Sequence, residues 1–232
     1  MKHLVVLSGA GMSAESGLKT FRDSNGLWEG HDVMSVASPE GFQKNPELVL
    51  EFYNQRRRQL LEVKPNSAHL YLADLERDFK VSIVTQNVDD LHERAGSSSV
   101  LHLHGELLKV RSTANPKDIK EWKTDLNVGD LCINGYQLRP DIVWFGEEVP
   151  LIPAAASICQ DADVLLIIGT SMQVYPAASL INYVKAQTKI YYIDPNPATV
   201  DHPQLTVIAE NAASGLSKIN CVDKSSLVLM FT

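Results

Sequence analysis

Short apolar runs alternate with longer amphipathic stretches along most of this chain, and this alternation constrains the fold more than any other feature. Four of the runs are β-prone and apolar on both faces, at residues 4–7, 81–84, 164–168 and 190–193. Strands of this kind belong to parallel sheets that helices cover on both sides. We therefore predict an α/β fold built on a Rossmann-like, doubly wound parallel sheet.

Helix-like segments fill the intervals at residues 47–62, 67–78 and 176–187, and the first and last of them open at a proline. Residues 24–46 form an irregular, loop-rich excursion, and residues 109–139 are polar and lysine-rich. We predict one domain over residues 1–232, with a cofactor-binding loop at about 24–46 and a small inserted lobe at about 109–139. Two segments that extend away from one sheet would leave a cleft between them, in which a ligand would bind.

The charge balance and the cysteine count exclude several classes of protein. With 21 Lys and Arg against 28 Asp and Glu, the formal net charge is −7, which is not the basic footprint of a direct nucleic-acid binder. No apolar stretch is long enough to cross a bilayer or to act as a signal peptide. The three cysteines are scattered and odd in number, so we expect no disulfide framework. We expect a soluble, cytoplasmic protein without a membrane partner.

The first predicted strand runs directly into the glycine-containing turn GAGMSAESG at residues 9–17. Glycines between a strand and a helix let backbone N–H groups approach a phosphate. The spacing departs from G-x-G-x-x-G, however, so a tight turn between two packed elements explains these glycines equally well.

Two further polar motifs stand near the ends of predicted strands. Residues 86–89, Gln-Asn-Val-Asp, follow a buried strand at the edge where open α/β sheets bind ligands, although Asn and Asp could equally cap the next helix. His102 and His104 alternate with leucines, so in a strand both would point to one face. No carboxylate or thiol stands near them at metal-ligand spacing. We therefore predict no metal at these histidines.

The motifs, taken in order, resemble those of the sirtuins, the NAD-dependent protein deacylases. Residues 9–22 are similar to the signature GAG-x-SAESG-x-x-TFR, residues 86–89 to the second signature, and residues 102–105 to the catalytic-histidine motif. Two more motifs follow in the family's order, at residues 143–147 and 169–171. The resemblance runs from about residue 4 to residue 213. It implies the same fold and an NAD-dependent protein deacylase that acts on acylated lysine side chains.

In the reaction that this resemblance implies, NAD is consumed rather than reduced. The acyl-lysine carbonyl oxygen attacks C1′ of the nicotinamide ribose, and nicotinamide leaves. The ribose 2′-oxygen then attacks the acyl carbon, and water releases free lysine and 2′-O-acyl-ADP-ribose. By the same resemblance His104 is the general base, Asn87 is the second catalytic residue and His102 is a structural neighbour. An imidazole titrates near neutral pH, which suits removal of a proton from a ribose hydroxyl.

The resemblance also carries over a set of NAD-binding residues. Asn87 and Asp89 would contact the nicotinamide ribose and carboxamide, and residues 169–171 would hold the adenosine side. Asp194 stands where the family commonly has asparagine, and an acid there can accept ribose hydroxyls. The full set is Gly9, Ala10, Gly11, Ala14, Glu15, Thr20, Phe21, Arg22, Trp28, Gln86, Asn87, Asp89, Gly169, Thr170, Ser171, Asp194, Asn196 and Ala213.

Tyr53 and Arg56 lie three residues apart in the predicted helix 47–62 and so share a face. Composition alone would make the run at residues 56–58 a solvated cationic stretch. Some sirtuins of the bacterial and mitochondrial desuccinylase branch carry this Tyr-x-x-Arg pair, however, and there the arginine can pair with the distal carboxylate of succinyl- or malonyl-lysine. We therefore predict removal of acidic acyl groups, with deacetylation as a secondary activity. The residues expected to pair with the substrate peptide as an added strand are Val143, Phe145, Gly146 and Glu147.

The inserted lobe departs from the family at the position of its structural zinc. Counted from the flanking motifs, the two cysteine pairs should fall at Ser112/Asn115 and Gly129/Cys132, where only Cys132 is a thiol. One soft ligand cannot build a tetrahedral zinc site, so we predict no bound zinc. The lobe would instead be held by packing, through Trp122, Leu126, Leu131 and Ile133.

Two other functions remain open beside deacylation. A protein mono-ADP-ribosyltransferase would use the same activated ribose with a different nucleophile. A non-catalytic NAD-binding sensor is a further class, although such a protein would not need to retain Asn87, Asp89 and His104 together. An ordinary dehydrogenase does not fit the glycine pattern.

Overall fold

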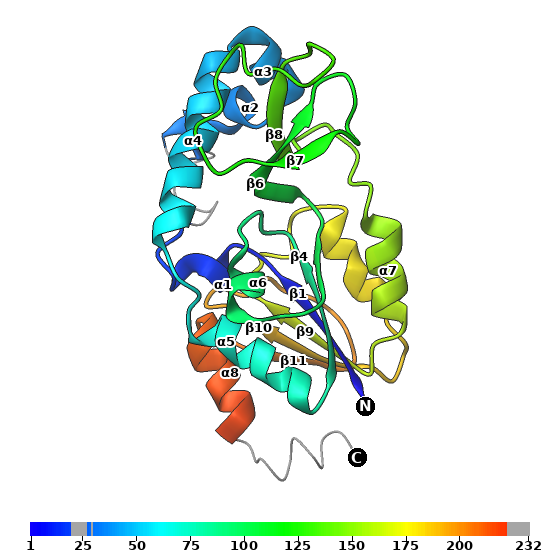
Figure 1. Cartoon of the computed structure of the whole chain (residues 1–232). Coiled ribbons are helices and arrows are strands. Elements are labelled where there is room, and N and C mark those ends of the chain that lie inside the picture. Colours follow the sequence, from blue (N-terminus) through cyan, green and yellow to red (C-terminus); the bar gives the residue numbers. More distant parts are fainter. Residues whose placement is uncertain (20–26, 29, 222–232) are drawn as a thin grey trace.

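The computed structural model describes residues 1–19, 27–28 and 30–221, which form a large sheet with flanking helices and a smaller lobe beside it (Figure 1). The sheet has six parallel strands, which lie in the order β11 (Leu205–Ile208), β10 (Lys189–Ile193), β9 (Val164–Ile168), β1 (His3–Ser8), β4 (Lys80–Thr85) and β5 (Val100–His102). The chain starts at the centre with β1, fills one side through β4 and β5, and fills the other side through β9 to β11. The predicted doubly wound sheet is confirmed.

All four predicted strands lie in this sheet, and their ends differ from the prediction by at most one residue. The two edge strands were not among these four runs, although the alternation around His102 and His104 was considered as a strand; β5 ends at His102, so His104 lies beyond it. β5 has three residues, and in β11 Thr206 and Val207 are exposed. Edge strands of this kind lack the apolar residues on both faces that identify a central strand.

Alternate residues of β1 face two different layers of helices. Leu4 and Val6 pack against one side of the core, whereas Val5 and Leu7 pack against the other. The first side is covered by α5 (Ser67–Asp74), η1 (Leu75–Arg77) and α8 (Ala212–Cys221), and the second by α7 (Ile152–Gln160) and η2 (Ala177–Tyr183). Two short helices, α1 (Gly11–Ala14) and α6 (Leu91–Ala95), follow β1 and β4. The predicted helix 67–78 corresponds to α5, which continues into the 3-10 turn η1. The predicted helix 176–187 is a shorter 3-10 helix, η2.

The smaller lobe combines helices from one part of the chain with strands from another. Its elements are α2 (Val33–Val36), α3 (Pro39–Lys44), α4 (Pro46–Glu62), the pair β2 (Leu27–Trp28) and β3 (His31–Asp32), and the antiparallel sheet of β7 (Ile119–Glu121), β6 (Gly105–Ser112) and β8 (Leu138–Ile142). The predicted helix 47–62 is confirmed as α4. The prediction of an irregular stretch at 24–46 is wrong where α2 and α3 lie. The Ser38 hydroxyl accepts a hydrogen bond from the Gly41 N–H at 2.9 Å, and Pro39 occupies the first turn of α3, which are ordinary helix-start signals.

Helix α4 holds the inserted lobe through a two-point hydrogen bond. The Asn54 amide donates to the Leu126 carbonyl at 3.0 Å and accepts from the Leu126 N–H at 2.8 Å. Leu126 is buried and Trp122 is packed against the same cluster, as predicted. The prediction is wrong for Leu131 and Ile133, which are 49% and 97% exposed. They lie at a tight turn in which the Cys132 N–H donates to the Tyr136 carbonyl, and this turn directs them outward.

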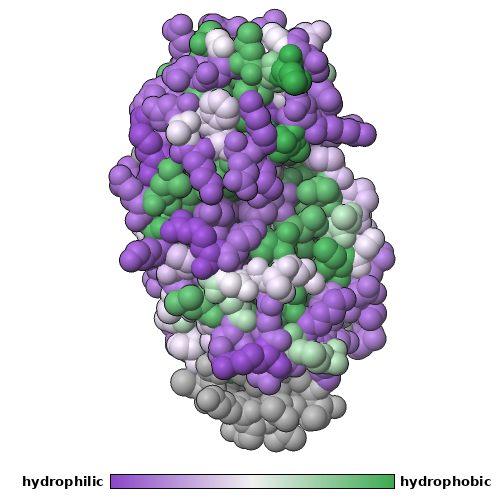
Figure 2. All heavy atoms as spheres, in the orientation of Figure 1, coloured by the Kyte–Doolittle hydropathy of each residue, from purple (hydrophilic) through white to green (hydrophobic). Residues whose placement is uncertain are grey.

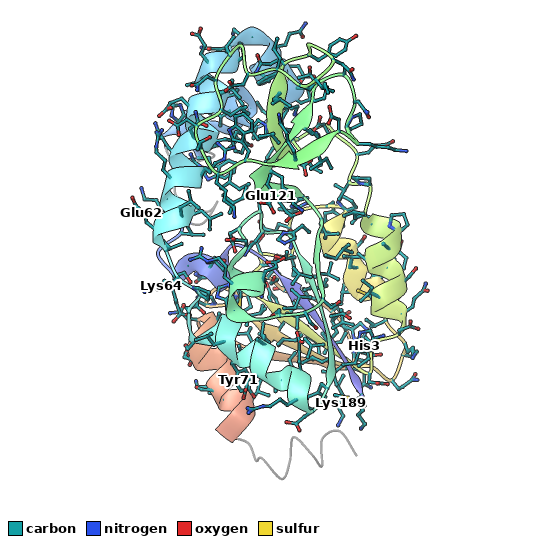
Figure 3. All side chains as sticks on the ribbon, viewed as in Figure 1. His3, Glu62, Lys64, Tyr71, Glu121 and Lys189 are labelled. Atoms are coloured by element: carbon teal, nitrogen blue, oxygen red, sulfur yellow. The ribbon has the colours of Figure 1, made fainter. Side chains whose placement is uncertain are left out.

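The carboxyl ends of the parallel strands face the smaller lobe (Figure 1). Figure 3 labels His3 and Lys189 at the amino-terminal edge of the sheet, and Glu62 and Lys64 where α4 ends and the chain continues toward α5. The loops that follow β1, β4, β5 and β9 therefore meet beside the smaller lobe. This is the edge at which open α/β sheets bind ligands.

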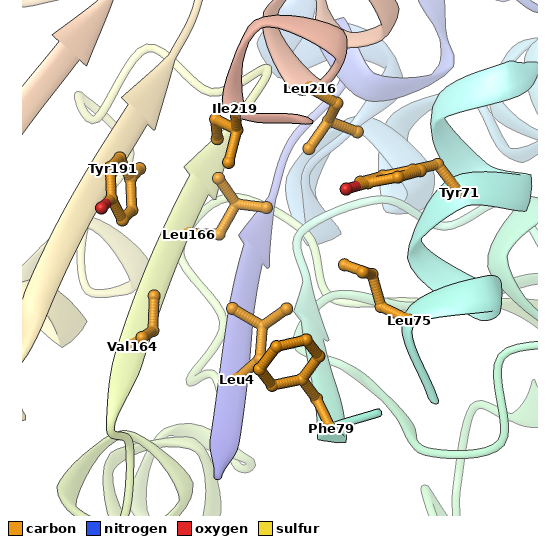
Figure 4. Close-up of a pocket in the computed structure, with 9 residues that line it drawn as sticks. All are labelled: Leu4, Tyr71, Leu75, Phe79, Val164, Leu166, Tyr191, Leu216 and Ile219. Atoms are coloured by element: carbon orange, nitrogen blue, oxygen red, sulfur yellow. The ribbon is translucent and has the colours of Figure 1, made fainter. Parts of the chain in front are cut away.

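A small pocket lies on another part of the sheet, under α5 and α8 (Figure 4). It is lined by apolar and aromatic residues, namely Leu4, Tyr71, Leu75, Phe79, Val164, Leu166, Tyr191, Leu216 and Ile219. The residues predicted for NAD or substrate are absent from its lining. Figure 2 shows hydrophilic side chains over much of this face of the molecule, with hydrophobic side chains gathered in its middle band. None of the described helices combines the length and hydropathy needed to cross a membrane.

Candidate active site

The loops after β1 and β9 touch through their backbones at the point where the strand order reverses. The Gly9 N–H donates to the Ile168 carbonyl at 3.0 Å, and the Gly11 N–H donates to the Gly169 carbonyl at 2.8 Å. Gly169 has φ +61, and a Cβ there would lie 2.2 Å from the Met12 nitrogen. Only glycine fits such a position. The glycines of the first motif therefore serve a close backbone approach at the topological switch point, where a dinucleotide site is expected.

A buried polar cluster joins the loop after β1 to the segment Gln86–Asp89 after β4. The Ser13 hydroxyl donates to Asp89 Oδ2 at 2.9 Å and accepts from Asn87 Nδ2 at 3.1 Å. Burial raises the pKa of Asp89, while hydrogen bonds from the Ser13 hydroxyl and the Leu91 N–H act in the opposite direction. Asn87 and Asp89 are thus placed together with their polar atoms fixed.

His104 lies directly beyond the carboxyl end of β5, next to this cluster. Its Nδ1 is 3.1 Å from the Gln86 carbonyl oxygen. A carbonyl can only accept, so the proton is on Nδ1 and the neutral ring has its lone pair on Nε2. Burial lowers the pKa of His104, with the Gln86 hydrogen bond opposing the shift. Neutral imidazole with an unprotonated Nε2 is the form that a general base requires.

The residue after His104 fixes where this side chain sits relative to the smaller lobe. Gly105 has φ +82, and a Cβ there would lie 1.9 Å from the Asp141 carbonyl oxygen. The His104 carbonyl accepts from the Val143 N–H at 2.9 Å. The chain therefore turns sharply from the sheet into β6, and it leaves His104 between the two parts of the molecule.

Arg56 lies in an aromatic cluster at the side of α4. Its guanidinium carbon is 3.4 Å from the centroid of Phe52 and 4.9 Å from that of Trp28, and its Nη1 donates to the Phe52 carbonyl at 2.8 Å. Tyr53 is 1% exposed, and its hydroxyl accepts from Trp144 Nε1 at 3.0 Å. Burial raises the pKa of Tyr53, so its hydroxyl stays protonated. The structure thus groups the predicted substrate residues Tyr53 and Arg56 with Trp28, which was predicted to bind the cofactor.

The loop after β8 is anchored by Glu147. Its carboxylate accepts from Arg139 Nη1 at 2.6 Å, from Arg139 Nη2 at 3.0 Å and from the Trp144 N–H at 2.8 Å. Phe145, by contrast, is 41% exposed, and the backbone at Gly146 has φ +88. The carboxylate of Glu147 therefore holds the loop in place, and the Phe145 side chain is only partly buried.

The structure also brings several of the residues predicted to bind NAD into contact with one another. Gln86 Nε2 donates to Thr170 Oγ1 at 3.0 Å, which joins the loops after β4 and β9. Glu15 Oε2 accepts from the Ala213 N–H at 3.0 Å, although these residues are far apart in sequence. Asp194 is buried at the end of β10. The predicted residues Thr20, Phe21 and Arg22 lie outside the described residues.

The Sir2 family profile matches residues 9–176. The chain belongs to the Sir2 family. It is 61% identical over 220 residues to an NAD-dependent protein deacylase of Helicobacter pylori strain J99, and the match covers 94% of each chain. A solved Sir2 homologue mutant in complex with ADP-ribose has a TM-score of 0.88 at 39% identity and covers 98% of this chain and 94% of that chain. A Sir2 homologue in complex with NAD has a TM-score of 0.82 at 39% identity and covers 94% and 88%.

Several residues of this Sir2 site were not singled out from the sequence. Ser13 stands inside the glycine motif, and its hydroxyl links Asn87 to Asp89. Phe52 and Trp144 surround Arg56 and Tyr53. Phe52 and Trp144 are adjacent in sequence to predicted substrate residues, and this proximity could have pointed to them. Aromatic residues at such positions are equally common in a hydrophobic core, however.

The donor set of the site fits NAD. The glycine loops after β1 and β9 pack without side chains between them, and the hydroxyl, amide and carboxylate groups at the strand ends suit ribose hydroxyls and a carboxamide. Among the described residues, no three His, Cys, Asp or Glu side chains gather as a metal site.

Acid is expected to destabilise this Sir2 protein through two buried histidines. The rings of His69 and His92 meet edge to face with their centroids 4.9 Å apart, and burial lowers their pKa values to about 4 and about 3. In the unfolded chain both would titrate near 6.5. The unfolded state therefore binds more protons below pH 6.5, and stability falls by a few kcal/mol (~1.4 per pKa unit) as the pH drops from 6.5 toward 4. The raised pKa of His102 acts in the opposite direction, but the pKa values of His3 and His104 are also lowered.

The measurement is the free energy of unfolding by urea between pH 4.5 and 7.5. His69→Gln should flatten the acid slope. An equal slope in wild type and His69→Gln would contradict the assignment.

Proposed function

We propose that this protein removes acyl groups from lysine side chains of proteins in an NAD-dependent reaction, releasing nicotinamide, free lysine and 2′-O-acyl-ADP-ribose. The observation that carries the proposal is the neutral His104, with its free Nε2, beside the Asn87–Ser13–Asp89 cluster at the switch point of the sheet. The name of the Helicobacter pylori relative points to the same activity.

In this proposal NAD supplies a ribose whose bond to nicotinamide is readily broken. Asn87 and Asp89 bind and orient the nicotinamide ribose and carboxamide, and Ser13 keeps both side chains in position. Nε2 of His104 accepts the proton from the ribose hydroxyl while Nδ1 remains bonded to the Gln86 carbonyl. Thr170, Ser171 and Asp194 hold the adenosine half. The loop with Val143, Phe145 and Gly146 pairs with the substrate peptide, and Glu147 holds that loop in place.

We further propose that the preferred acyl groups are succinyl and malonyl, with acetyl as a secondary substrate. Arg56 supports this proposal because its guanidinium is stacked on Phe52 and oriented by the Phe52 carbonyl. A guanidinium fixed in this way can form a charge-assisted fork with the distal carboxylate. Tyr53 and Trp28 lie beside it and would line the acyl chain.

The inserted lobe is proposed to fold without zinc. Of the four expected ligand positions only Cys132 is a thiol, and the Asn54–Leu126 bonds tie the lobe to α4 instead. Purified protein should therefore contain well under one zinc per chain by elemental analysis and should keep its activity in a chelator. Stoichiometric zinc would contradict the proposal.

The free thiols of Cys132 and Cys159 suit the reducing cytoplasm.

The experiment that tests the function is nicotinamide release from NAD in the presence of acyl-lysine and unmodified-lysine versions of one peptide. Release that requires the acyl group is expected. ADP-ribose attached to protein would favour a mono-ADP-ribosyltransferase. NAD binding without nicotinamide release would favour a sensor, and absorbance of reduced cofactor would indicate a dehydrogenase.

A further inference from the structure

One imidazole bridges the two ends of the turn that carries Asn87 and Asp89. His102, at the end of β5, places Nδ1 2.9 Å from the Asn87 carbonyl oxygen and Nε2 2.8 Å from Glu93 Oε1. Glu93 belongs to α6, the helix that begins directly after the turn. The ring therefore connects the start of the turn to the helix that ends it.

The hydrogen-bond chemistry of this bridge determines its protonation. A main-chain carbonyl and a carboxylate are both acceptors, so each ring nitrogen of His102 donates and the ring is an imidazolium. Burial by itself would lower the pKa of His102, but the hydrogen bond and charge of Glu93 raise it above the ordinary value. Glu106 adds to the rise. The charge of His102 in turn opposes the burial that raises the pKa of Asp89, and it adds to the burial that lowers the pKa of His92. The His102 side chain is 7% exposed and that of Glu93 39%, so the carboxylate neutralises the buried charge from the solvent side.

The bridge acts on the same segment whose side chains are held by Ser13. Ser13 fixes the side chains of Asn87 and Asp89, whereas His102 fixes the main chain at Asn87. Without Glu93 the imidazole would lose one of its two bonds and could rotate away from the Asn87 carbonyl. The imidazole would then no longer fix the main chain at Asn87, and the side chains of Asn87 and Asp89 would keep their bonds to Ser13.

We propose that Glu93, acting through His102, is a positioning residue that holds the Gln86–Asp89 turn in the geometry that binds NAD. The inference rests on the proposed NAD-dependent deacylation and adds to it a residue remote from the reacting atoms. Nothing in the position of Glu93, on an outward part of a short helix, would single it out without the bridge.

The test compares Glu93→Ala, Glu93→Gln and the control Glu76→Ala. Glu76 is a second carboxylate, which lies in η1 before β4 and accepts from the Ser98 N–H before β5 at 2.8 Å, so it is at the opposite ends of these strands from the turn. Glutamine can donate to Nε2 of a neutral His102 while Nδ1 keeps its proton for the Asn87 carbonyl, so it should preserve the bridge. The readouts are the Kd for NAD by calorimetry, the KM for NAD, the KM for an acyl-lysine peptide, and the melting temperature.

Glu93→Ala should raise the Kd and KM for NAD on the order of tenfold and leave the peptide KM within about twofold. Glu93→Gln and Glu76→Ala should stay within about twofold of wild type in every constant. An unchanged NAD affinity in Glu93→Ala would overturn the proposal, and so would equal losses of NAD and peptide affinity that follow a lowered melting temperature. A wild-type protein that binds NAD without turnover would contradict the proposed function, whereas the calorimetric comparison would still decide the role of Glu93.

Discussion

Replacement of His104 by alanine is expected to lower the rate of deacylation by about 10²- to 10⁴-fold, the usual contribution of a general base. His104 is the imidazole in the described part of the site whose Nε2 is free to take a proton while Nδ1 is bonded to the Gln86 carbonyl. Alanine removes the base but leaves the Ser13, Asn87 and Asp89 cluster, so NAD should still bind. The measurement is kcat/KM for an acyl-lysine peptide at saturating NAD.

The pH profile provides an independent check on the same residue. Burial lowers the pKa of His104, so the neutral base persists as the pH falls, and the acid limb of the wild-type profile should lie below the ordinary imidazole value near 6.5. His202→Ala is the matched control and should retain wild-type rates. Full activity of His104→Ala would remove this residue from the mechanism.

Replacement of Arg56 by methionine is expected to reduce kcat/KM for a succinyl-lysine peptide by about 10- to 100-fold, because a hydrogen bond to a charged partner contributes about 1.5–3 kcal/mol. The same change should alter kcat/KM for the acetyl-lysine peptide by less than about threefold, since acetyl has no distal carboxylate. Methionine keeps an unbranched apolar stem against Phe52 and Trp28. The loss should therefore report the guanidinium rather than the packing.

Arg58→Met is the control for this comparison. Arg58 stands on the same helix, but it pairs on the surface with Glu51 and Asp125. Its loss should leave the ratio of succinyl to acetyl activity unchanged. Equal losses on both peptides in Arg56→Met, or an acetyl preference in the wild type, would keep the deacylase mechanism and refute the acyl specificity.

The parts of the fold that could be predicted are those in which the hydrophobicity of the residues matches their burial in the fold. Residues 164–168 are apolar on both faces because β9 is covered on both sides, so the strand was predicted to the residue. Ile133 is just as apolar in sequence, yet it is 97% exposed because a turn at Cys132–Tyr136 directs it outward. Hydrophobicity predicts burial only where the backbone is regular.

In the site, too, some features could be predicted from the sequence and others could not. The motifs identified His104, Asn87 and Asp89, and the structure gathers all three at one sheet edge. The tautomer of His104 could not be predicted, because its partner is a main-chain carbonyl that only the pairing of β5 with β4 brings near. The inward orientation of Glu147 could not be predicted either, because it depends on Arg139 and on the loop around Trp144. Such contacts depend on register and loop geometry rather than on residue type.

The fate of the acyl group tests the central claim most directly. Protein, NAD and a succinyl-lysine peptide are allowed to react, and the products are quantified by mass spectrometry. The account predicts equal amounts of nicotinamide, unmodified peptide and an ADP-ribose that carries the succinyl group. Free succinate with intact NAD, or ADP-ribose without the acyl group, would contradict it.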